Sequence, residues 1–483
     1  MDWKTLLSAE RSRNGSSFKL HEQPSLATNF LTDFSRDPDR VSFSSAFRRL
    51  QGKTQVYMFP QTDFVRNRLT HSLEVASIGR NLIAGIYKGL MAEKTQFKKA
   101  NVDIPFNDLS DIVAAACLAH DLGNPPFGHI GEYAIRSWFK ENFSPIPSSN
   151  GDKEQNSEAR AEETSRRPAL DDISAAQRMD FELFDGNAQS FRLVTRMQNW
   201  SGNGGLRLTA ATLGALVKYP NTASSKTPFK KGKFGVYNDD LEIFEALAGV
   251  LQLKKKGDGS YARHPLAFVT EAADDIAYLT SDIEDARKFG VLSFEEAEEL
   301  LLPAAKLLDG FSTDEFERIE KGKVRLKFLR STAALAMIDH CAKAFVRNEE
   351  KILSGEMTSS LLSSEGKNRR MQAIETDLRK KNQEKIYHMY RKVKAEAGAY
   401  EVIRSMLTDF SDAVENKVRF GDKPSERSQN LLCLVDHTEP SFSSQSDPYK
   451  LYLGLVDYVS GMTDRYAIDI CETLCGRKLS LGY

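Results

Sequence analysis

Residues 71–90 read HSLEVASIGRNLIAGIYKGL, and residues 324–346 read VRLKFLRSTAALAMIDHCAKAFV. In both stretches apolar residues recur at spacings of three and four, which is the period of an amphipathic α-helix. The same period runs through most of the chain. Strand patterns are few: TQVYMF (residues 54–59) and KFGVY (residues 233–237) predict a short hairpin or edge strands. The sequence therefore predicts a mainly α-helical fold with at most a short β-hairpin.

The size and charge of the chain exclude several classes of protein. With 483 residues, at roughly 150 per domain, it forms about three domains or one large helical body with insertions. Because 66 Lys and Arg face 67 Asp and Glu, the whole chain is not a polycation that coats nucleic acid. No stretch approaches the roughly 18 apolar residues of a membrane span, and MDWKTLLSAERSRNGSS lacks a signal-peptide core. We expect a cytoplasmic protein without a membrane contact.

The five cysteines are scattered and odd in number, which favours reduced thiols over a disulfide framework. Cys471 and Cys475 lie one helical turn apart in CETLC, but no histidine or further cysteine accompanies them. Core packing is therefore a better interpretation of this pair than a zinc site.

Three polar segments interrupt the helical pattern. Residues 144–180 hold few large apolar side chains and predict a flexible surface insertion. Residues 355–398 are highly charged and predict one long exposed helix, a C-terminal subdomain or an oligomer arm. The loop SSKTPFKKGKFG (residues 224–235) carries four lysines, of which Lys226 is the first and Lys233 the last. It is either a solvated loop or a phosphate or nucleic-acid contact.

Three of the eight histidines lie in two short segments, RNRLTHSLEVA with His71 and CLAHDLGNPPFGHIGE with His120 and His129. In the second segment an apolar helix ends at the adjacent His120 and Asp121, ahead of a glycine and two prolines. Imidazole and carboxylate are natural ligands for Mn, Fe, Co or Zn. A lone His-Asp pair is weak evidence, because it arises by chance in many proteins.

A third segment, EAADDIAYLTSDIEDARKFG (residues 271–290), strengthens the prediction of a metal site. It places Asp274, Tyr278 and Asp282 at positions i, i+4 and i+8, on one face of a helix. Acids on a helix usually form a solvated face. Here the small apolar neighbours of Asp274 permit close packing, and a buried carboxylate is costly unless it meets a cation.

Seven motifs together resemble the HD-domain deoxynucleoside triphosphate triphosphohydrolases of the dGTPase-like family. In chain order they are RRLQGKTQV, VRNRLTHSLEV, AHDLGNPPFGHIGE, FDGNAQSFRLVT, GLRLTAATLGALVKYP, RHPLAFVTEAADDIAYLTSDIED and DYVSGMTDRYA. They span most of the chain. Two features depart from the common pattern: Asp185 stands where the family often has Glu, and the polar insertion precedes it.

The resemblance implies one divalent metal ion held by His71, His120, Asp121 and Asp274. Two imidazoles and two carboxylates leave open positions for water and a phosphate oxygen. Asp274 is preferred over Asp275 because the family's acid follows the alanine, and Asp275 points about 100° away on a helix. Such a site would accept Mn, Mg, Co or Fe.

The resemblance also implies the reaction, which is hydrolysis of a dNTP, with dGTP preferred, to deoxynucleoside and tripolyphosphate. Water attacks the α-phosphorus and the 5′ oxygen leaves. Arg68 matches the family's phosphate-contacting arginine, and Lys218 and Tyr219 match a phosphate-side pair. His129 matches the catalytic acid, and Glu132 lies three residues later, able to orient the imidazole and hold it charged.

Further matches concern the sugar and the base. Tyr278 and Asp282 resemble the residues that pack on the deoxyribose and accept from its 3′-hydroxyl, and Gln55 resembles a second sugar contact. Val56 would lie near the base. Asn187 matches a conserved polar position without an assigned role.

By the same resemblance, residues 1–340 would form an HD-type catalytic core. Residues 341–483 would form a helical C-terminal region that completes the pocket and the contacts of a homo-oligomer, a tetramer or hexamer. One alternative is an HD phosphodiesterase or nucleotidase acting on another phosphate ester. Another is a nucleotide-sensing regulator whose loop 226–233 binds nucleic acid. Single-stranded nucleic acid or a second dNTP remains open as an effector.

Overall fold

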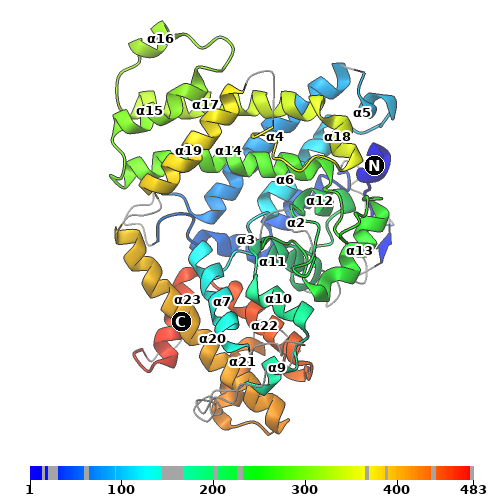
Figure 1. Ribbon diagram of the computed structural model, residues 1–483, viewed down its shortest axis with the longest axis vertical. Helices are drawn as coiled ribbons and strands as arrows, with labels where there is room; N and C mark the ends of the chain where they lie inside the picture. The colour runs from blue at the N-terminus through cyan, green and yellow to red at the C-terminus, as the bar shows by residue number, and fades with distance from the viewer. Residues whose placement is uncertain are drawn as a thin grey trace, which may run out of the picture.

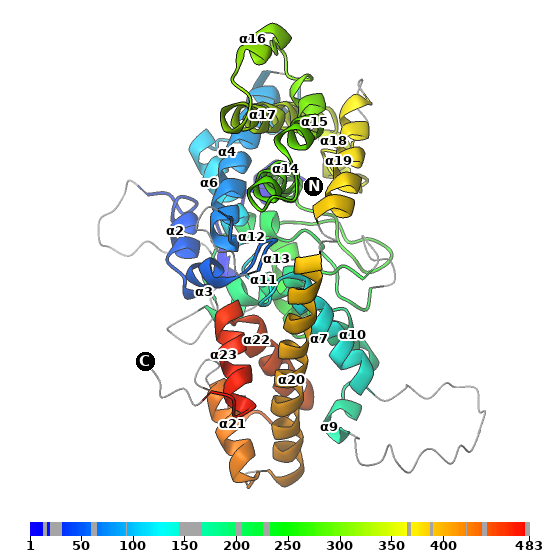
Figure 2. The ribbon, with the colours of Figure 1, turned by 90° about the vertical axis from the view of Figure 1, so that its left-hand side faces the viewer.

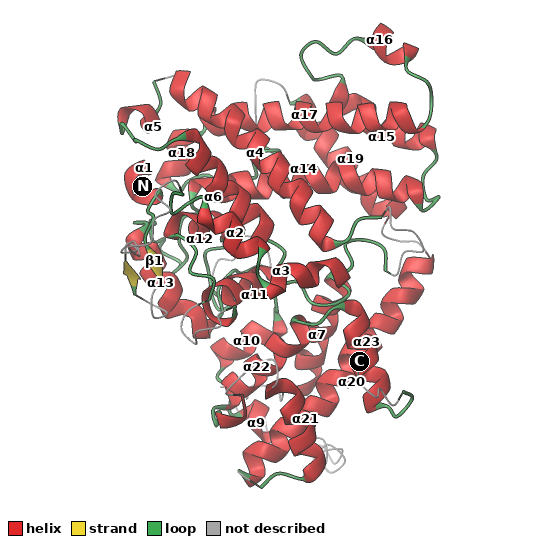
Figure 3. Ribbon diagram, turned by 180° about the vertical axis from the view of Figure 1, so that it is seen from behind, coloured by secondary structure: helices red, strands yellow, loops and turns green. Residues whose placement is uncertain are grey.

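The computed structural model describes residues 1–12, 17–19, 31–58, 65–92, 94–143, 167–198, 205–225, 232–364, 369–386, 390–421, 423–436 and 442–478. Helices dominate this part of the chain (Figure 3). Its sheet is a two-stranded antiparallel hairpin of β1 (Arg11–Ser12) and β2 (Phe18–Lys19). The mainly α-helical fold predicted from the sequence is confirmed.

Two hydrophobic cores stack along the long axis of the molecule (Figure 1). The first core fills the upper part of the view. Its elements are α1 (Trp3–Leu6), α2 (Arg36–Ser42), α3 (Ser45–Arg49), η1 (Leu50–Gly52), α4 (Arg68–Ala92), α5 (Gln96–Lys99), α6 (Phe106–Ala119), η2 (Leu193–Met197), α12 (Ala210–Leu216), α13 (Leu241–Val250), α14 (Pro265–Lys288), α15 (Phe294–Ala305), α16 (Thr313–Arg318), α17 (Lys323–Arg347), α18 (Glu349–Ser354) and α19 (Arg370–Ile386).

The second core fills the lower part, where the long helix α20 runs beside its neighbours (Figure 2). Its elements are α7 (His129–Asn142), α9 (Pro168–Asp171), α10 (Ala175–Glu182), α11 (Gly186–Arg192), η3 (Asn238–Asp240), α20 (Tyr390–Phe420), α21 (Glu426–Asp436), η4 (Phe442–Ser444), α22 (Pro448–Ser460) and α23 (Asp464–Leu474). The second core therefore joins segments from the middle and the end of the chain. The division of the chain at residue 340 stays a prediction, and α17 runs through that point.

Three long helices of the first core set the geometry of the site. The helix α4 packs against α6, α14 and α17. The helix α14 begins at Pro265, a residue suited to the first helical turn, behind His264, whose Nδ1 accepts the N–H of Leu266 at 3.1 Å. The helix α6 ends at Ala119, and Gly123 then passes so close to α11 that a Cβ there would lie 2.2 Å from the backbone nitrogen of Ser190. This close approach brings the ends of α6 and α11 together.

The structure corrects the two predicted strands. Of residues 54–59, Thr54 forms only an isolated bridge with Asn67, and Phe59 lies outside the described residues. Of residues 233–237, Val236 forms only an isolated bridge with Thr222. Both segments are loops that reach the cavity wall, and their backbone groups find other partners: Asp464 binds the N–H of Thr54, and the carbonyl of Asn221 binds the N–H of Gly235.

The predicted polar segments also differ from the structure. Residues 144–166 lie outside the described part, but residues 167–180 form α9 and most of α10, and Ala169, Leu170 and Ile173 are buried in the second core. The charged segment 355–398 contributes to two helices, α19 and α20, instead of one exposed helix. Its Met371 and Leu378 are buried against the first core. A few well-spaced apolar residues suffice to dock these otherwise charged helices.

The last two predictions about the fold were that Cys471 and Cys475 pack in the core and that no segment spans a membrane. Cys471 is half-buried against the second core and Cys475 is exposed, so core packing applies to one of the pair. Within the described residues, no helix is both long and apolar enough to cross a membrane.

Candidate active site and metal centre

A cavity of about 630 Å³ opens between the two cores. Helices α4, α7 and α14 line it, together with the loop after α6 and the ends of α11 and α12, and α19 and α20 reach its edge. Most of the site residues predicted from the sequence lie on its wall: Gln55, Val56, Arg68, His71, His120, Asp121, His129, Glu132, Asn187, Lys218, Tyr219, Asp274 and Tyr278.

Four ligand-type side chains converge at the base of this cavity. His71 comes from α4, His120 and Asp121 follow the end of α6, and Asp274 comes from α14. Ligand atoms of His71, His120 and Asp121 all lie within 4.8 Å of one another. The Oδ1 atom of Asp274 lies 3.1 Å from Nε2 of His71 and 3.5 Å from Nε2 of His120. Three helices far apart in the sequence therefore present their donor atoms to one point.

The environment of His120 fits a divalent cation. Its Nδ1 lies 2.7 Å from the carbonyl oxygen of Cys117, to which it donates, so Nε2 is the ring atom that faces the cluster. That Nε2 atom is buried and has no hydrogen-bond partner among the described residues. Burial lowers the pKa of His120, but the carboxylates of Asp121 and Asp274 outweigh it and raise the pKa to about 9. The cluster thus attracts positive charge, and its two nitrogens and two carboxylates suit Mn, Fe, Co or Zn.

The two adjacent acids of α14 point to different partners. Asp274 faces the histidines, which hold its pKa well below the ordinary value although burial opposes ionisation. Asp275 instead pairs with Arg379 of α19, with an oxygen–nitrogen distance of 2.9 Å. Neighbouring residues of a helix point about 100° apart, so Asp274 faces the cluster while Asp275 pairs with Arg379.

Arg68 lies directly beside the cluster. Its Nη1 donates to Oδ2 of Asp121 at 2.5 Å, while its buried Nε has no hydrogen-bond partner among the described residues. Asn124 donates to the other oxygen of Asp121. Arg68 is therefore held with spare donor capacity at the wall of the cavity, as an anion-binding group requires.

His129 and Glu132 form a pair at the rim. His129 is the first residue of α7 and its side chain is 84% exposed, with Nδ1 3.3 Å from Oε2 of Glu132. Glu132 is buried and accepts from the backbone N–H of Gly186 at 2.9 Å and from Arg136 at 3.3 Å. Burial opposes ionisation of Glu132, but His129, Lys233 and Arg136 keep its pKa far below the ordinary value. A charged carboxylate thus orients an accessible imidazole.

Two lysines add positive charge to the cavity. Lys218 lies 3.5 Å from Glu271, which also binds Arg263 at 2.7 Å. Lys233 lies 3.0 Å from Asp185. Burial lowers the pKa of both lysines, but nearby carboxylates outweigh it. Glu271 raises the pKa of Lys218 above its ordinary value, and Glu132 and Asp185 do the same for Lys233. Both side chains therefore remain charged in the cavity.

Asp185 accounts for the position of Asn187. Its Oδ1 accepts the backbone N–H of Asn187 at 2.9 Å and the side-chain amide at 2.7 Å, and it caps the N-terminus of α11. Asn187 is thereby held against the cavity.

The predicted sugar-side residues divide into two groups. Gln55, Val56 and Tyr278 line the cavity, and Oε1 of Gln55 is buried without a hydrogen-bond partner among the described residues. Asp282 lies one turn beyond Tyr278, is 1% exposed and is not part of the cavity lining.

The chain is similar to known proteins along nearly its whole length. The HD domain family matches residues 68–215, which include His71, His120 and Asp121 but not Asp274. A deoxyguanosinetriphosphate triphosphohydrolase-like protein of Pseudomonas aeruginosa is 35% identical over 99% of each chain. One of Synechocystis is 33% identical over 99% of this chain and all of the other. A deoxyguanosinetriphosphate triphosphohydrolase of Salmonella arizonae is 30% identical over 91% of this chain and 92% of the other.

The chain belongs to the deoxyguanosinetriphosphate triphosphohydrolase-like family. This confirms the resemblance found in the seven motifs. Because the matches extend over almost the whole chain, family membership covers the C-terminal helices as well as the HD domain.

Three residues of the cavity wall were not assigned to it from the sequence. Lys233 belongs to the basic loop, which the sequence left open as a solvated loop or a phosphate or nucleic-acid contact, and residues 226–231 of this loop lie outside the described part. Arg379 and Gln383 lie in the charged segment 355–398, for which the sequence left open an exposed helix, a subdomain or an oligomer arm. The signal for Lys233 was the local density of lysines, and no sequence signal distinguished Arg379 and Gln383.

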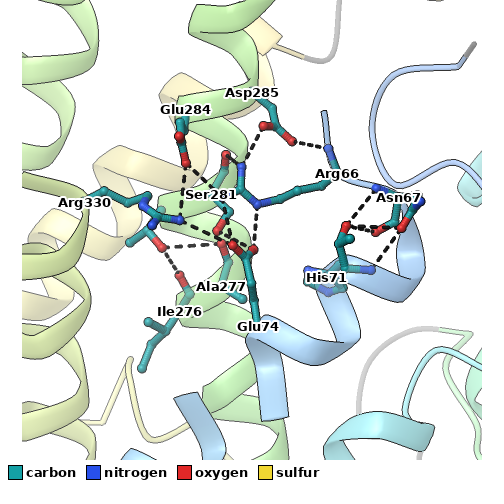
Figure 4. A network of polar contacts seen from close by, with 12 residues as sticks. Arg66, Asn67, His71, Glu74, Ile276, Ala277, Ser281, Glu284, Asp285 and Arg330 are labelled. Carbon is teal, nitrogen blue, oxygen red and sulfur yellow. Dashed lines mark hydrogen bonds and ion pairs between the residues drawn. The ribbon is translucent and has the colours of Figure 1, made fainter. Parts of the chain in front are cut away.

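An ion-pair network fixes the start of α4 against α14 (Figure 4). Arg66 donates to Glu74 at 2.6 Å, to Glu284 at 2.8 Å and to Asp285 at 2.7 Å. Arg330 of α17 lies 3.4 Å from Glu74 and 3.3 Å from Glu284. The network lies within two turns of His71, so it holds this histidine in register with α14.

We expect Arg66→Met to lower the free energy of unfolding by about 3 kcal/mol, because three carboxylates lose their shared partner in a largely buried site. Urea denaturation would measure the change. Arg80→Met is the matched control on α4, since Arg80 lies 3.8 Å from Asp111 and is largely exposed, and it should cost less than about 1 kcal/mol. Equal midpoints for the two variants would contradict a stabilising role for the network.

Proposed function

We propose that this protein hydrolyses a deoxynucleoside triphosphate, with dGTP preferred, to deoxynucleoside and tripolyphosphate. The observation that carries the proposal is the convergence, on one cavity, of a four-residue metal cluster, an oriented histidine and three cations. The names of the relatives, deoxyguanosinetriphosphate triphosphohydrolase and its like, support the choice of substrate.

His71, His120, Asp121 and Asp274 would hold the divalent ion, which when bound supplies Lewis acidity to a phosphate oxygen and lowers the pKa of water. Mn, Mg, Co and Fe are the candidates. Asp121 has a second task, because its other bonds, to Arg68 and Asn124, fix the carboxylate in place.

Arg68, Lys218 and Lys233 would bind the triphosphate. Each is a charged donor on the cavity wall, and a triphosphate brings several negative charges that must be met by cations. Tyr219 packs beside Lys218, with the ammonium 5.7 Å from the ring centroid, and so narrows the phosphate side of the cavity. Asn187 adds an amide at the same wall.

His129 would donate a proton to the leaving 5′ oxygen. Because Nδ1 faces the buried carboxylate of Glu132, the proton available to the substrate is the one on Nε2. Glu132 is a positioning residue in this scheme.

The deoxyribose would pack on Tyr278 and bond to Gln55, whose Oε1 atom is buried and unsatisfied in the described structure. Val56 would lie near the base. Asp282 lies outside the cavity lining, so its proposed bond to the 3′-hydroxyl requires the sugar to reach past Tyr278. Homo-oligomer formation, a cytoplasmic location, and activation by nucleic acid or a second dNTP stay predictions.

The test is to incubate the purified protein with each dNTP and each NTP in Mn or Mg, and to resolve the products by anion-exchange chromatography. Deoxynucleoside and tripolyphosphate in equal amounts are expected, with the largest rate for dGTP. Release of pyrophosphate, inorganic phosphate or a nucleoside monophosphate would instead indicate one of the other phosphate-ester activities. No turnover of any dNTP, even in a mixture of all four, would contradict the proposal.

We expect Lys233→Met to raise KM for the best dNTP about tenfold or more, since a charge-assisted hydrogen bond contributes about 1.5–3 kcal/mol. Bound metal, measured by elemental analysis, should not change. Lys255→Met is the control, because Lys255 is exposed and pairs with Glu245 away from the cavity. An unchanged KM for Lys233→Met would remove Lys233 from the phosphate site.

A further inference from the structure

The motif DYVSGMTDRYA (residues 457–467) has no part in the chemistry proposed above. It spans the end of α22 and the start of α23 in the second core. As far as the structure is described, none of its side chains lines the cavity. Its polar groups instead contact three segments that do.

Asp464 joins two of these segments through one carboxylate. Its Oδ1 accepts the backbone N–H of Phe127 at 2.8 Å, and its Oδ2 accepts the backbone N–H of Thr54 at 2.9 Å and the Thr54 hydroxyl at 2.5 Å. The residue is 4% exposed. Two backbone donors that would otherwise be buried without partners are thus satisfied by a residue over 300 positions away in the chain.

The two segments that Asp464 binds carry predicted site residues one or two positions further along the chain. Thr54 precedes Gln55 and Val56, and Phe127 is two residues before His129. Phe127 also has a φ of 64°, a conformation that is unfavourable for a non-glycine residue and persists only where its surroundings impose it. The bond from Asp464 to the N–H of Phe127 is one such constraint, applied where α7 is about to begin.

Other groups of the motif reinforce the same contact. The ammonium of Lys53 donates to the carbonyls of Asn124 at 2.6 Å and Ser460 at 2.8 Å. Asp457 accepts from Gln189 at 2.7 Å and Arg192 at 2.8 Å on α11, the helix that carries Asn187. The contact therefore extends across the loop before Gln55, the loop before His129, and α11.

We infer that Asp464 is a positioning residue for the hydrolysis, setting the distance between the sugar-side loop 54–56 and His129. The inference rests on the proposed function. It makes the C-terminal helices part of the active-site framework, because the group that aligns the two loops belongs to α23. Asparagine would keep the shape of the Asp464 side chain, but only its single oxygen can accept a hydrogen bond. Its NH₂ group would then face the backbone N–H of Thr54 or Phe127, which is also a donor.

The experiment compares Asp464→Asn with Tyr449→Phe. Tyr449 lies in α22, and its hydroxyl donates to Asp180 at 2.6 Å within the second core, away from the cavity. Both changes remove a buried hydrogen bond from the C-terminal helices. Measurements are kcat and KM at a temperature well below either melting point, bound metal, and amide hydrogen exchange of Thr54 and Phe127.

We expect Asp464→Asn to lower kcat about tenfold or more with bound metal unchanged, since displacement of a reacting group by 1 Å costs up to about 100-fold. The amides of Thr54 and Phe127 should exchange faster in this variant. Tyr449→Phe should keep kcat and both exchange rates. If Asp464→Asn does not fold, Asp464→Glu, which keeps the charge but lengthens the side chain, takes its place with the same expectations.

Equal kcat values per folded molecule for Asp464→Asn and the wild type would overturn the inference, as would unchanged exchange at Thr54 and Phe127. If the wild-type protein hydrolyses no dNTP, the proposed function fails. The exchange rates then decide by themselves whether Asp464 holds the two loops.

Discussion

Replacing His120 by alanine is expected to abolish both metal retention and turnover. The structure gives this residue a single role in the cavity: Nδ1 is bound to the carbonyl of Cys117, and the buried Nε2 faces Asp121 and Asp274. Removing the ring takes away one of the two imidazole nitrogens that face Asp121 and Asp274, while Arg68 stays on Asp121 and His71 on Asp274. Three side chains then remain to hold the ion, and a divalent ion in such a cluster depends on imidazole nitrogen as well as carboxylate oxygen.

Elemental analysis after gel filtration would measure retained metal, and tripolyphosphate release would measure turnover. His340→Ala is the matched control, because His340 lies in α17 and outside the cavity lining. It should retain wild-type metal content and rate. Full metal content with full activity in His120→Ala would remove the residue from the metal site. Circular dichroism of His120→Ala would show whether a loss of metal and turnover occurs in a folded protein.

Replacing His129 by alanine is expected to preserve the metal and lower kcat about 10²- to 10⁴-fold, the range of a lost general acid. The side chain is 84% exposed at the rim and does not contact the metal cluster, so neither metal affinity nor stability should change much. Its loss removes the proton source for the 5′ oxygen, and an unprotonated alkoxide is a poor leaving group.

A substrate with sulfur in place of the 5′ bridging oxygen tests this role directly. A thiolate leaves without a proton, so the penalty of His129→Ala should shrink for the thio substrate while it stays large for the natural dNTP. The same loss with both substrates would mean that His129 acts in binding or alignment. Full activity of the variant toward the natural dNTP would contradict any catalytic role.

Much of the site followed from local sequence. Helical period predicted the helical fold, and the run from His120 to Glu132 combined a helix end, a turn and the start of α7 within a few residues. Such local patterns depend on backbone propensity and on spacing along one helix, which a sequence displays directly. The choice of Asp274 over Asp275 followed from the resemblance to the family, and helical geometry points the two side chains in different directions.

Local sequence failed where a contact depended on distant residues. Residues 54–58 alternate like a strand, but Asp464 binds Thr54 and no neighbouring strand is present to pair with the segment in the described structure. Ala169 and Leu170 in α9 are buried only because α20 and α22 cover them. Patterns of two or three apolar residues do not reveal which surface they will meet.

Sequence alone determined the helical class and the family, because the helical period and the seven motifs are read directly from residue identity. The four ligand-type residues followed from the resemblance to that family and stay a prediction. Only the tertiary structure decided that Lys233 and Arg379 line the cavity, that Asp282 is buried outside its lining, and that Asp464 spans two site loops. The physical reason is that side-chain contacts between distant segments depend on how the two cores pack, and that packing is set by the whole chain at once.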